Sequence, residues 1–487
     1  MRPIVQECAS SLAPEQLVNE LNGQRGVVLL RSLLGTSIDP NHSTPIQQAR
    51  YSFVVANPFL TFRSSGSHCE ISHPESGEVQ IQFGNPWRLM DSLMSRYELL
   101  DELDLPFPLG GCFGYWGYDL KNFVEPHLPR RAVNDLELLD CHIGFYDSVV
   151  AFDHQLGKIW IISTGLDATG TRFEKRALEK VAWWKSLLAK VSETTHPPSS
   201  FTSHSKTEPI SNLTKEAFEE RVRRAQAYIR TGDIYQVNLS HRLTATWPGT
   251  GFELFSALST VSPAPFAAYV DCGNFQIASS SPEQFLRLSG PHIRTRPIKG
   301  TRPRSNDPTR DAQLSYELQT SAKEMSELVM ITDLLRNDLG RVCEYGSVQV
   351  PELMRLERYP QVQHLVSTVE GRLRSDVTHF GAFASCFPGG SITGAPKIRA
   401  MEIIDELEPI SRGPYTGALG YLGFNRESQL SIIIRTAICK DGEAHFHVGA
   451  GIVADSSPQA EHEETIAKAR GFFAALNADF KRSTARV

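Results

Sequence analysis

The stretch Ala418-Leu419-Gly420-Tyr421-Leu422-Gly423-Phe424 opens a run of strand-like segments near the end of the chain. Similar segments follow at about residues 429–438 and 444–453, and a final helix is expected at about 457–477. Strands that follow strands, without a helix after each one, favour antiparallel pairing over the parallel sheets of alternating folds. This part of the sequence therefore predicts an α+β fold with largely antiparallel sheets.

The same arrangement in blocks continues toward the N-terminus. A helix begins after Thr214, a good N-cap, and Gly232 can end it. A long helix is expected at about residues 311–338, ending at Gly340. Further strand-like segments lie at about residues 234–246, 266–271, 275–280 and 284–288. Helices and strands do not alternate regularly along the chain, which supports the α+β class.

Residues 192–211 mark the clearest break in the chain. They are rich in Ser, Thr and Pro, which is typical of a linker or a long surface loop. We therefore expect an N-terminal, strand-rich region over residues 1–191 and a second region over residues 212–480.

Composition excludes several classes of protein. The 487 residues carry 49 Lys and Arg against 55 Asp and Glu, a formal net charge of −6, which argues against nucleic-acid binding. No segment approaches the ~20 apolar residues that span a membrane, and no signal peptide is recognisable. The eight cysteines include no C-x-x-C pair. These features predict a cytoplasmic enzyme or binding protein with reduced thiols.

Two motifs are misleading. Gly110-Gly111-Cys112-Phe113-Gly114 resembles the nucleophile turn of glutamine amidotransferases, and His73 and Glu75 form a His-x-Glu pair, but this pair precedes the cysteine, whereas in that class of enzyme it follows. Residues 389–397 resemble a phosphate loop, but Ala-Pro separates the glycine from Lys397. We expect neither a glutaminase site nor ATP binding.

A basic segment, residues 294–304, holds Lys299 among four arginines. Two prolines and a glycine restrict its backbone, and Ile298 favours burial. Neighbouring positive charge and burial both disfavour an ammonium group, so Lys299 is a candidate nucleophile in its neutral amine form.

Two helices carry glutamates at i, i+3 spacing, which places each pair on one helix face. The pairs are Glu324 with Glu327 and Glu461 with Glu464. One such pair is usually a solvated face. Two pairs that converge would suit a hard cation such as Mg²⁺.

Three further residues are candidates for chemistry or binding. Glu283 follows an expected strand and could act as a general acid. His364 is a lone histidine, which is more often structural than catalytic. Arg435 lies within an apolar run and needs an anionic partner, for which a ligand carboxylate is a natural choice.

Together these segments resemble the chorismate-utilising enzymes, over about residues 212–478 strongly and 20–165 more loosely. The resemblance rests on several long strings, which are residues 232–239, 296–304, 333–340, 388–397 and 449–456. It implies two large packed antiparallel sheets flanked by helices, and a chorismate-binding catalytic domain over residues 212–480.

Lys299 decides which branch of the family is implied. The anthranilate synthase large subunit typically has alanine there, and isochorismate and salicylate synthases typically have a water-activating lysine where this chain has Gln236. The pattern implies amination at C4, giving 4-amino-4-deoxychorismate, the precursor of 4-aminobenzoate and folate. Anthranilate synthase and a non-catalytic chorismate-sensing subunit remain alternatives.

The resemblance also implies roles for individual residues. Lys299 would add to C2 of chorismate, Glu283 would be the general acid, and His364 would lie near the ring. Glu327 and Glu464 would bind Mg²⁺ directly, and Glu324 and Glu461 through water. The implied substrate contacts are Thr301, Thr393, Tyr421, Arg435, Gly451, Lys468 and the nearby Gln236. A separate glutamine amidotransferase subunit is expected to supply ammonia.

Overall fold

The computed structural model describes residues 2–8, 12–32, 50–100, 103–193, 208–359 and 362–476. Within these ranges the strands form two sheets of twelve strands each, and the paired strands run antiparallel. The predicted fold class, α+β with two large antiparallel sheets, is confirmed.

Sheet A contains strands from both ends of the chain. Its order is β1 (Ile4–Cys8), β10 (Lys158–Ser163), β9 (Ser148–Asp153), β3 (Tyr51–Val55), β2 (Val28–Arg31), β13 (Phe266–Asp271), β14 (Gln276–Ser281), β23 (Thr436–Lys440), β24 (Glu443–Ile452), β12 (Gln236–Thr246) and β11 (Ile210–Ser211), with β20 (Gly394–Ala395) also paired to β12.

Sheet B likewise contains strands from both parts of the chain. Its order is β17 (Ile298–Pro303), β19 (Val362–Arg372), β16 (His292–Arg296), β15 (Gln284–Ser289), β22 (Glu427–Ile432), β21 (Ala418–Gly423), β7 (Gly111–Trp116), β8 (Cys141–Tyr146), β4 (Leu60–Ser65), β5 (His68–His73) and β6 (Glu78–Phe83), with β18 (Gln349–Arg358) also paired to β19.

The two regions separated by the expected linker share both sheets. In sheet A, β2 from the first region pairs with β13 from the second, and in sheet B, β7 pairs with β21. The two regions are therefore joined by continuous hydrogen-bonded ladders. Most of the expected linker, residues 194–207, lies outside the described residues.

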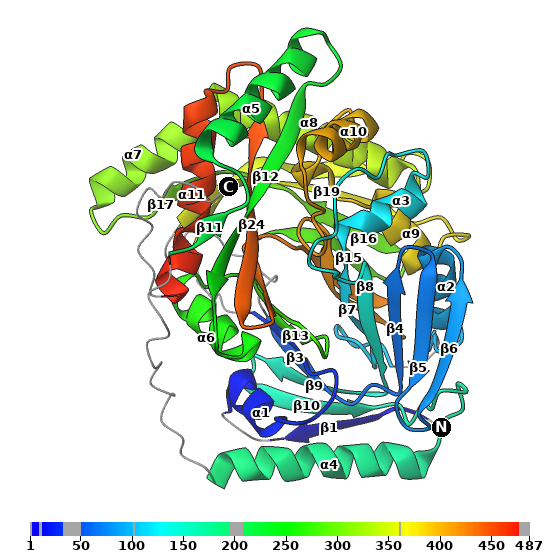
Figure 1. Cartoon of the computed structure of the whole chain (residues 1–487). Coiled ribbons are helices and arrows are strands. Elements are labelled where there is room, and N and C mark those ends of the chain that lie inside the picture. Colours follow the sequence, from blue (N-terminus) through cyan, green and yellow to red (C-terminus); the bar gives the residue numbers. More distant parts are fainter. Residues whose placement is uncertain are drawn as a thin grey trace.

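Helices cover the outer faces of the sheets (Figure 1). They are α1 (Pro14–Glu20), α2 (Pro86–Met94), α3 (Lys121–Val124), α4 (Glu174–Glu193), α5 (Lys215–Arg230), α6 (Gly251–Val261), α7 (Pro308–Gln319), α8 (Ala322–Gly340), α9 (His379–Cys386), α10 (Lys397–Leu407) and α11 (Pro458–Ala475), with two short 3₁₀ turns, η2 (Tyr118–Leu120) and η3 (Gly390–Ile392). One apolar cluster joins sheet A to α1, α4, α6 and α11, a second joins sheet B to α2, α8 and α9, and a third fills the space between the sheets.

The long helix expected at residues 311–338 is two helices, α7 and α8. The first ends at Thr320, and Ser321 caps the second by accepting a hydrogen bond from the Glu324 amide. A serine that competes for backbone hydrogen bonds favours a new helix start over continuation. The break fixes the direction of α8, which carries Glu324 and Glu327.

The strand expected at residues 429–438 is also divided. It ends in sheet B as β22 and resumes in sheet A as β23, so residues 433–435 carry the chain from one sheet to the other. Arg435 lies at this crossing with a positive φ of 53°, which is unfavourable for an arginine. An apolar run alone does not reveal such a change of sheet.

Candidate active site

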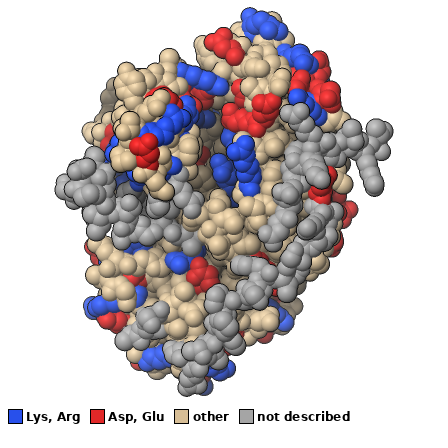
Figure 2. Space-filling model, turned by 90° about the vertical axis from the view of Figure 1, so that its left-hand side faces the viewer, with Lys and Arg blue, Asp and Glu red and all other residues tan. Residues whose placement is uncertain are grey.

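A cavity of about 640 Å³ lies at the side of the molecule where α8 and α11 face β17, β19 and β24. Figure 2 shows the face that carries α7, α11 and β17, where charged side chains of both signs gather around a hollow. Most of the residues singled out from the sequence line this cavity. They are Glu283, Lys299, Thr301, Glu324, Glu327, His364, Arg435, Gly451, Glu464 and Lys468.

Lys299 reaches the cavity from β17, beside an irregularity in the strand. The pairing of β17 with β19 shifts register between Lys299 and Thr301, and Gly300 between them has a φ of 63°. A side chain on Gly300 would meet Leu318 at 2.5 Å, so glycine is required there. The Lys299 amine lies 4.0 Å from an oxygen of Glu327.

The expected influence of the neighbouring arginines on Lys299 is not what the structure shows. Arg296 forms a buried ion pair with Glu357, Arg302 lies 3.6 Å from Glu324, and Arg304 contacts Asp311 at 2.9 Å. Along a strand, successive side chains point to opposite faces. The positive charge of these arginines is therefore balanced by carboxylates instead of being directed at Lys299.

The four glutamates of the two i, i+3 pairs do converge, around Lys323. All four raise the pKa of the Lys323 ammonium, against the opposing effect of burial, which is the largest single influence. Lys323 lies 3.7 Å from Glu461, and Lys468 lies 2.7 Å from Glu464. Burial raises the pKa of Glu327. At Glu464 burial is also the largest influence, but Lys468, Lys323 and Lys299 together lower the pKa.

This carboxylate group fits a hard cation in its chemistry. Four carboxylates offer the oxygen ligands that Mg²⁺ prefers, and the second oxygen of Glu461 is buried without a hydrogen-bond partner. In the described part of the chain, however, no three acidic, histidine or cysteine side chains lie close enough together to share a metal ion. Lysine ammonium groups occupy the positions beside these carboxylates.

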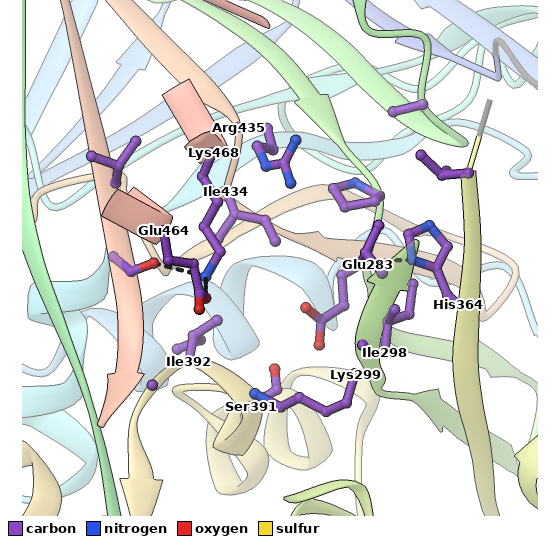
Figure 3. A pocket seen from close by; sticks show the side chains of 18 of the residues that line it. Glu283, Ile298, Lys299, His364, Ser391, Ile392, Ile434, Arg435, Glu464 and Lys468 are labelled. Atoms are coloured by element: carbon purple, nitrogen blue, oxygen red, sulfur yellow. Dashed lines mark hydrogen bonds and ion pairs between the residues drawn. The ribbon is translucent and has the colours of Figure 1, made fainter. Parts of the chain in front are cut away.

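Glu283 follows β14 and is 7% exposed. Burial raises the pKa of its carboxyl group, and a hydrogen bond with Ser391 and the charges of Lys299 and Lys468 oppose that rise. Figure 3 shows the Glu283 carboxyl group and the Lys299 side chain extending into the same space, near Ser391. A carboxyl group with a raised pKa beside an amine can donate a proton in this space.

His364 lies on β19, opposite Thr301 of β17. Its Nδ1 is 2.9 Å from the Thr301 hydroxyl group, and burial lowers its pKa to about 4. The imidazole is therefore neutral near pH 7. It can position a ligand or exchange hydrogen bonds there, but it does not carry a charge.

Arg435 is a half-buried cation aimed into the cavity (Figure 3). Burial lowers its pKa, and among the described residues no carboxylate forms an ion pair with its guanidinium group. Tyr415 lies on the same wall, with its ring stacked against His447 at 5.1 Å. A half-buried, unpaired guanidinium group is a strong site for a ligand carboxylate.

Lys468 and Gly451 line the cavity where α11 packs against β24, and Figure 3 shows Lys468 on the same side as Arg435 and Glu464. The Lys468 amine donates a hydrogen bond to the Gly449 carbonyl group at 2.9 Å. A side chain on Gly451 would meet the amide nitrogen of Gln236 at 2.4 Å. Gln236 is 2% exposed and packs behind this glycine instead of lining the cavity.

Three other residues singled out from the sequence also lie outside the cavity lining. The Thr393 hydroxyl group is fully buried and bonds the carbonyl groups of Gly389 and Gly390. Glu461 is buried behind Lys323 and accepts a hydrogen bond from Ser456. Tyr421 packs between Phe53 and Phe113 and borders a second, small cavity of about 40 Å³. The tyrosines that line the main cavity are Tyr359 and Tyr415.

The two misleading motifs have structural roles. Cys112 is fully buried in β7, and burial raises its pKa to about 12, which is unsuitable for a nucleophile. Glu75 is paired with Arg176 at 2.7 Å. Lys397 forms a 2.6 Å ion pair with Asp338 of α8 and bonds the Cys386 carbonyl group, so it is not available to a phosphate.

Several cavity residues were not found from the sequence. Lys323 directly precedes Glu324, so the sequence did signal a cation next to one of the glutamate pairs. Tyr415 and His447 carried no signal, because only the meeting of a loop with β24 brings them to the cavity. Ser391 lies within residues 389–397, and the resemblance of that segment to a phosphate loop does not point to its place in the cavity lining.

Comparisons with known proteins agree with this arrangement. The family model described as chorismate binding enzyme matches residues 49–474. The chain is 40% identical over 434 residues to anthranilate synthase component 1 of Acetivibrio thermocellus, covering 88% of this chain and 87% of that one. It is 41% identical over 421 residues to aminodeoxychorismate synthase component 1 of Klebsiella aerogenes, covering 86% and 88%.

A solved structure is similar over almost the whole chain. The crystal structure of anthranilate synthase component I from Streptococcus pneumoniae superposes with a TM-score of 0.75 at 30% identity and covers 96% of this chain and 98% of that one. The protein therefore belongs to the chorismate-binding enzyme family. No helix in the described ranges is long and apolar enough to cross a membrane.

Proposed function

We propose that the protein is an aminodeoxychorismate synthase component that replaces the C4 hydroxyl group of chorismate with an amino group. The observation that carries the proposal is Lys299 in the cavity, close to Glu283. The relatives are divided between aminodeoxychorismate synthases and anthranilate synthases at similar identity, so the choice depends on this residue.

Chorismate carries two carboxylates, and the cavity offers cations for both at separate places. Arg435 has no carboxylate partner among the described residues and would pair with one of them. Lys468, on α11, would contribute near the other, with the glycine backbone at Gly449 and Gly451 allowing close approach. Thr301 and the neutral His364 would border the ring between them.

The chemistry proposed is two displacements with allylic shift. The Lys299 amine adds to C2, the ring double bonds shift, and the C4 hydroxyl group leaves as water with a proton from Glu283. Ammonia then adds to C4, the double bonds shift back, and the Lys299 amine is released. Glu283, raised in pKa by burial, is suited to hold that proton until the hydroxyl group departs.

We also propose that Glu327 and Glu464 bind Mg²⁺ directly, with Glu324 and Glu461 acting through water. The ion would supply positive charge to a chorismate carboxylate. Binding requires Lys323 and Lys468 to release these carboxylates, so magnesium and the lysines would compete. Isothermal titration of Mg²⁺ should lose affinity about tenfold or more in Glu327→Gln or Glu464→Gln, and gain affinity in Lys323→Gln.

A separate amidotransferase subunit is proposed as the ammonia source. The relatives are each named as component 1 of their synthase, and Cys112 is too deeply buried to act as a glutaminase nucleophile. The chain alone should use ammonium but not glutamine. Release of glutamate from glutamine by the chain alone, abolished by Cys112→Ala, would contradict this.

The decisive experiment is mass spectrometry of the product formed from chorismate, Mg²⁺ and ammonium. The proposal expects 4-amino-4-deoxychorismate, which retains the enolpyruvyl group. Anthranilate, which is fluorescent and has lost pyruvate, would establish the alternative reaction. Absence of any product, with chorismate binding intact, would indicate a chorismate-sensing subunit.

A further inference from the structure

Strand β6 forms an open edge of sheet B. It is the last strand in the sheet order, and in the described part of the chain it pairs only with β5. All six of its residues, Glu78–Phe83, are exposed. Figure 1 shows it at the outer limit of the molecule, beside α2. An unpaired strand edge of this length offers its backbone hydrogen-bonding groups to another strand.

The edge also carries an apolar stripe. Val79, Ile81 and Phe83 are 54%, 56% and 77% exposed, and they share one face because strand residues alternate. Proteins usually protect such edges with charged residues, proline or a covering element. Here Glu78 is the only charged residue of the strand. This combination indicates an interaction surface.

We propose that β6 pairs with β6 of a second copy of this chain, around a two-fold axis at Ile81, joining the two B sheets into one continuous sheet. This proposal is independent of the reaction at the cavity. In the antiparallel register centred on Ile81, that residue faces the partner's Ile81, and Val79 faces the partner's Phe83. The pairing is self-complementary, as a two-fold interface requires.

Charge supports the same register. Glu78 faces the partner's Gly84, so the acidic side chains of the two copies are not opposed. On the other face, Gln80 lies opposite the partner's Gln82, and two amides can exchange hydrogen bonds. Apolar cross-strand pairs stabilise a ladder by up to about 1 kcal/mol each, and like charges directly opposite destabilise it.

The position of β6 argues against the ammonia-supplying subunit as its partner. Strands β17, which carries Lys299, and β6 are the two ends of the sheet B order. With neighbouring strands about 4.8 Å apart, the path along the sheet is on the order of 45 Å. Ammonia delivered at β6 would be released far from the cavity, whereas a second copy of this chain at β6 leaves the cavity open.

The test is the mass of the full-length protein in solution, by sedimentation equilibrium over a concentration series. We expect a species of twice the 54.2 kDa of one chain. Ile81→Lys places two lysines opposite each other and should give the monomer. The matched control is Leu156→Lys, which changes a residue of similar exposure, 55%, in the turn between β9 and β10 and should leave the dimer intact.

A second set of variants tests the register. Val79→Lys and Phe83→Glu should each weaken the dimer about tenfold or more, and the double variant should restore it, because each new lysine faces a new glutamate of the partner. Turnover of chorismate with ammonium should be unchanged in all of them, which verifies folding. A wild-type monomer at every concentration, a dimer that persists in Ile81→Lys, or a loss of only glutamine-dependent activity in that variant would each overturn the proposal.

Discussion

Lys299 is the one amine of the basic segment, and it lines the cavity together with Arg302. Its amine lies 4.0 Å from an oxygen of Glu327, whereas Arg296 and Arg304 are held by Glu357 and Asp311 away from the cavity lining. Replacement by alanine should therefore remove a reacting group without disturbing the ion pairs that hold β17.

Lys299→Ala should bind chorismate nearly as well as the wild type and lose at least about 100-fold in kcat, since a nucleophile acts only in the chemical step. Equilibrium binding and steady-state kinetics measure the two effects. Wild type incubated with chorismate without ammonia should gain the mass of dehydrated chorismate on the peptide that contains Lys299. A raised KM with unchanged kcat would instead make Lys299 an electrostatic contact.

Glu283 should give the reaction a pH dependence that Ser391 can shift. A general acid must be protonated, so kcat at constant free ammonia should fall as pH rises through the raised pKa of Glu283. Ser391→Ala removes a hydrogen bond that lowers this pKa, so the falling limb should move to higher pH. Glu283→Gln should lose most of its activity, and the kcat that remains should no longer fall as pH rises through this range. An unmoved limb in Ser391→Ala would assign it to another group.

At the same scale, the sequence was informative where a residue type implied its own environment. An arginine in an apolar run needed an anionic partner, and two Glu pairs at i, i+3 would suit a cation if they converged. The structure places these residues at the cavity, apart from Glu461 just behind it. It was uninformative for Tyr415 and His447, which reach the cavity only through tertiary packing. The predicted effect of the arginines on Lys299 was wrong, because Glu357 and Asp311 pair with Arg296 and Arg304. Glu357 is distant in the sequence, and Asp311 lies on helix α7.

Among the elements, the connection from α10 to β21 is held by one arginine. Arg412 is 2% exposed and donates hydrogen bonds to Glu408 at 2.6 and 2.8 Å and to the Asn238 carbonyl group at 2.7 Å. It also bonds the Ile392 carbonyl group at 3.2 Å. Because Asn238 and Ile392 line the cavity, this single side chain supports two of its walls.

Arg412→Met should lower the free energy of unfolding by about 3–5 kcal/mol, because it leaves the buried Glu408 carboxylate without its counter-ion. Urea denaturation measures the loss. The matched control is Arg372→Met, which removes an exposed ion pair with Glu344 at 3.2 Å and should cost no more than about 1 kcal/mol. Equal losses in the two variants would show that burial of the Arg412 pair is not the cause.

Element boundaries show which physical signals the sequence lacked. The bounds predicted at residues 418–424, 444–453 and 457–477 lie close to those of β21, β24 and α11. The division between β22 and β23 was missed, since a chain that changes sheets stays apolar throughout. The division between α7 and α8 had a signal in Ser321, which was masked by the helical pattern on either side.

For the whole molecule, buried histidines make stability depend on pH. Burial lowers the pKa of His142 and His241 to about 3 and of His364 and His379 to about 4, from the ordinary 6.5. Each stays neutral in the folded chain while the unfolded chain takes up a proton below about pH 6.5. Carboxyl groups whose pKa is raised by burial act in the opposite direction, among them Asp140, at about 6, and Asp147, Asp271 and Asp338. His154 and His445, lowered to about 4, add to the effect of the four histidines.

The free energy of unfolding should therefore fall as pH is lowered from 6.5 toward 4, by up to about 1.4 kcal/mol per pH unit for each such histidine. Urea denaturation at pH 7, 6 and 5 measures this slope. His379→Gln removes one of the four histidines, so the slope of the free energy of unfolding against pH should decrease by the contribution of about one proton. His127→Gln changes an exposed histidine and should leave the slope unchanged. A stability that rises between pH 7 and 5 would contradict the argument.

The ladders that join β2 to β13 and β7 to β21 have a consequence for the covalent chain itself. If the polypeptide were interrupted anywhere between residues 193 and 208, each piece would expose two long, apolar strand edges that only the other piece can complete. Separately produced, fragments 1–193 and 208–487 should aggregate. Co-expressed, they should reassemble and copurify as one active molecule, so continuity of the backbone is dispensable at this point while the presence of both fragments is not.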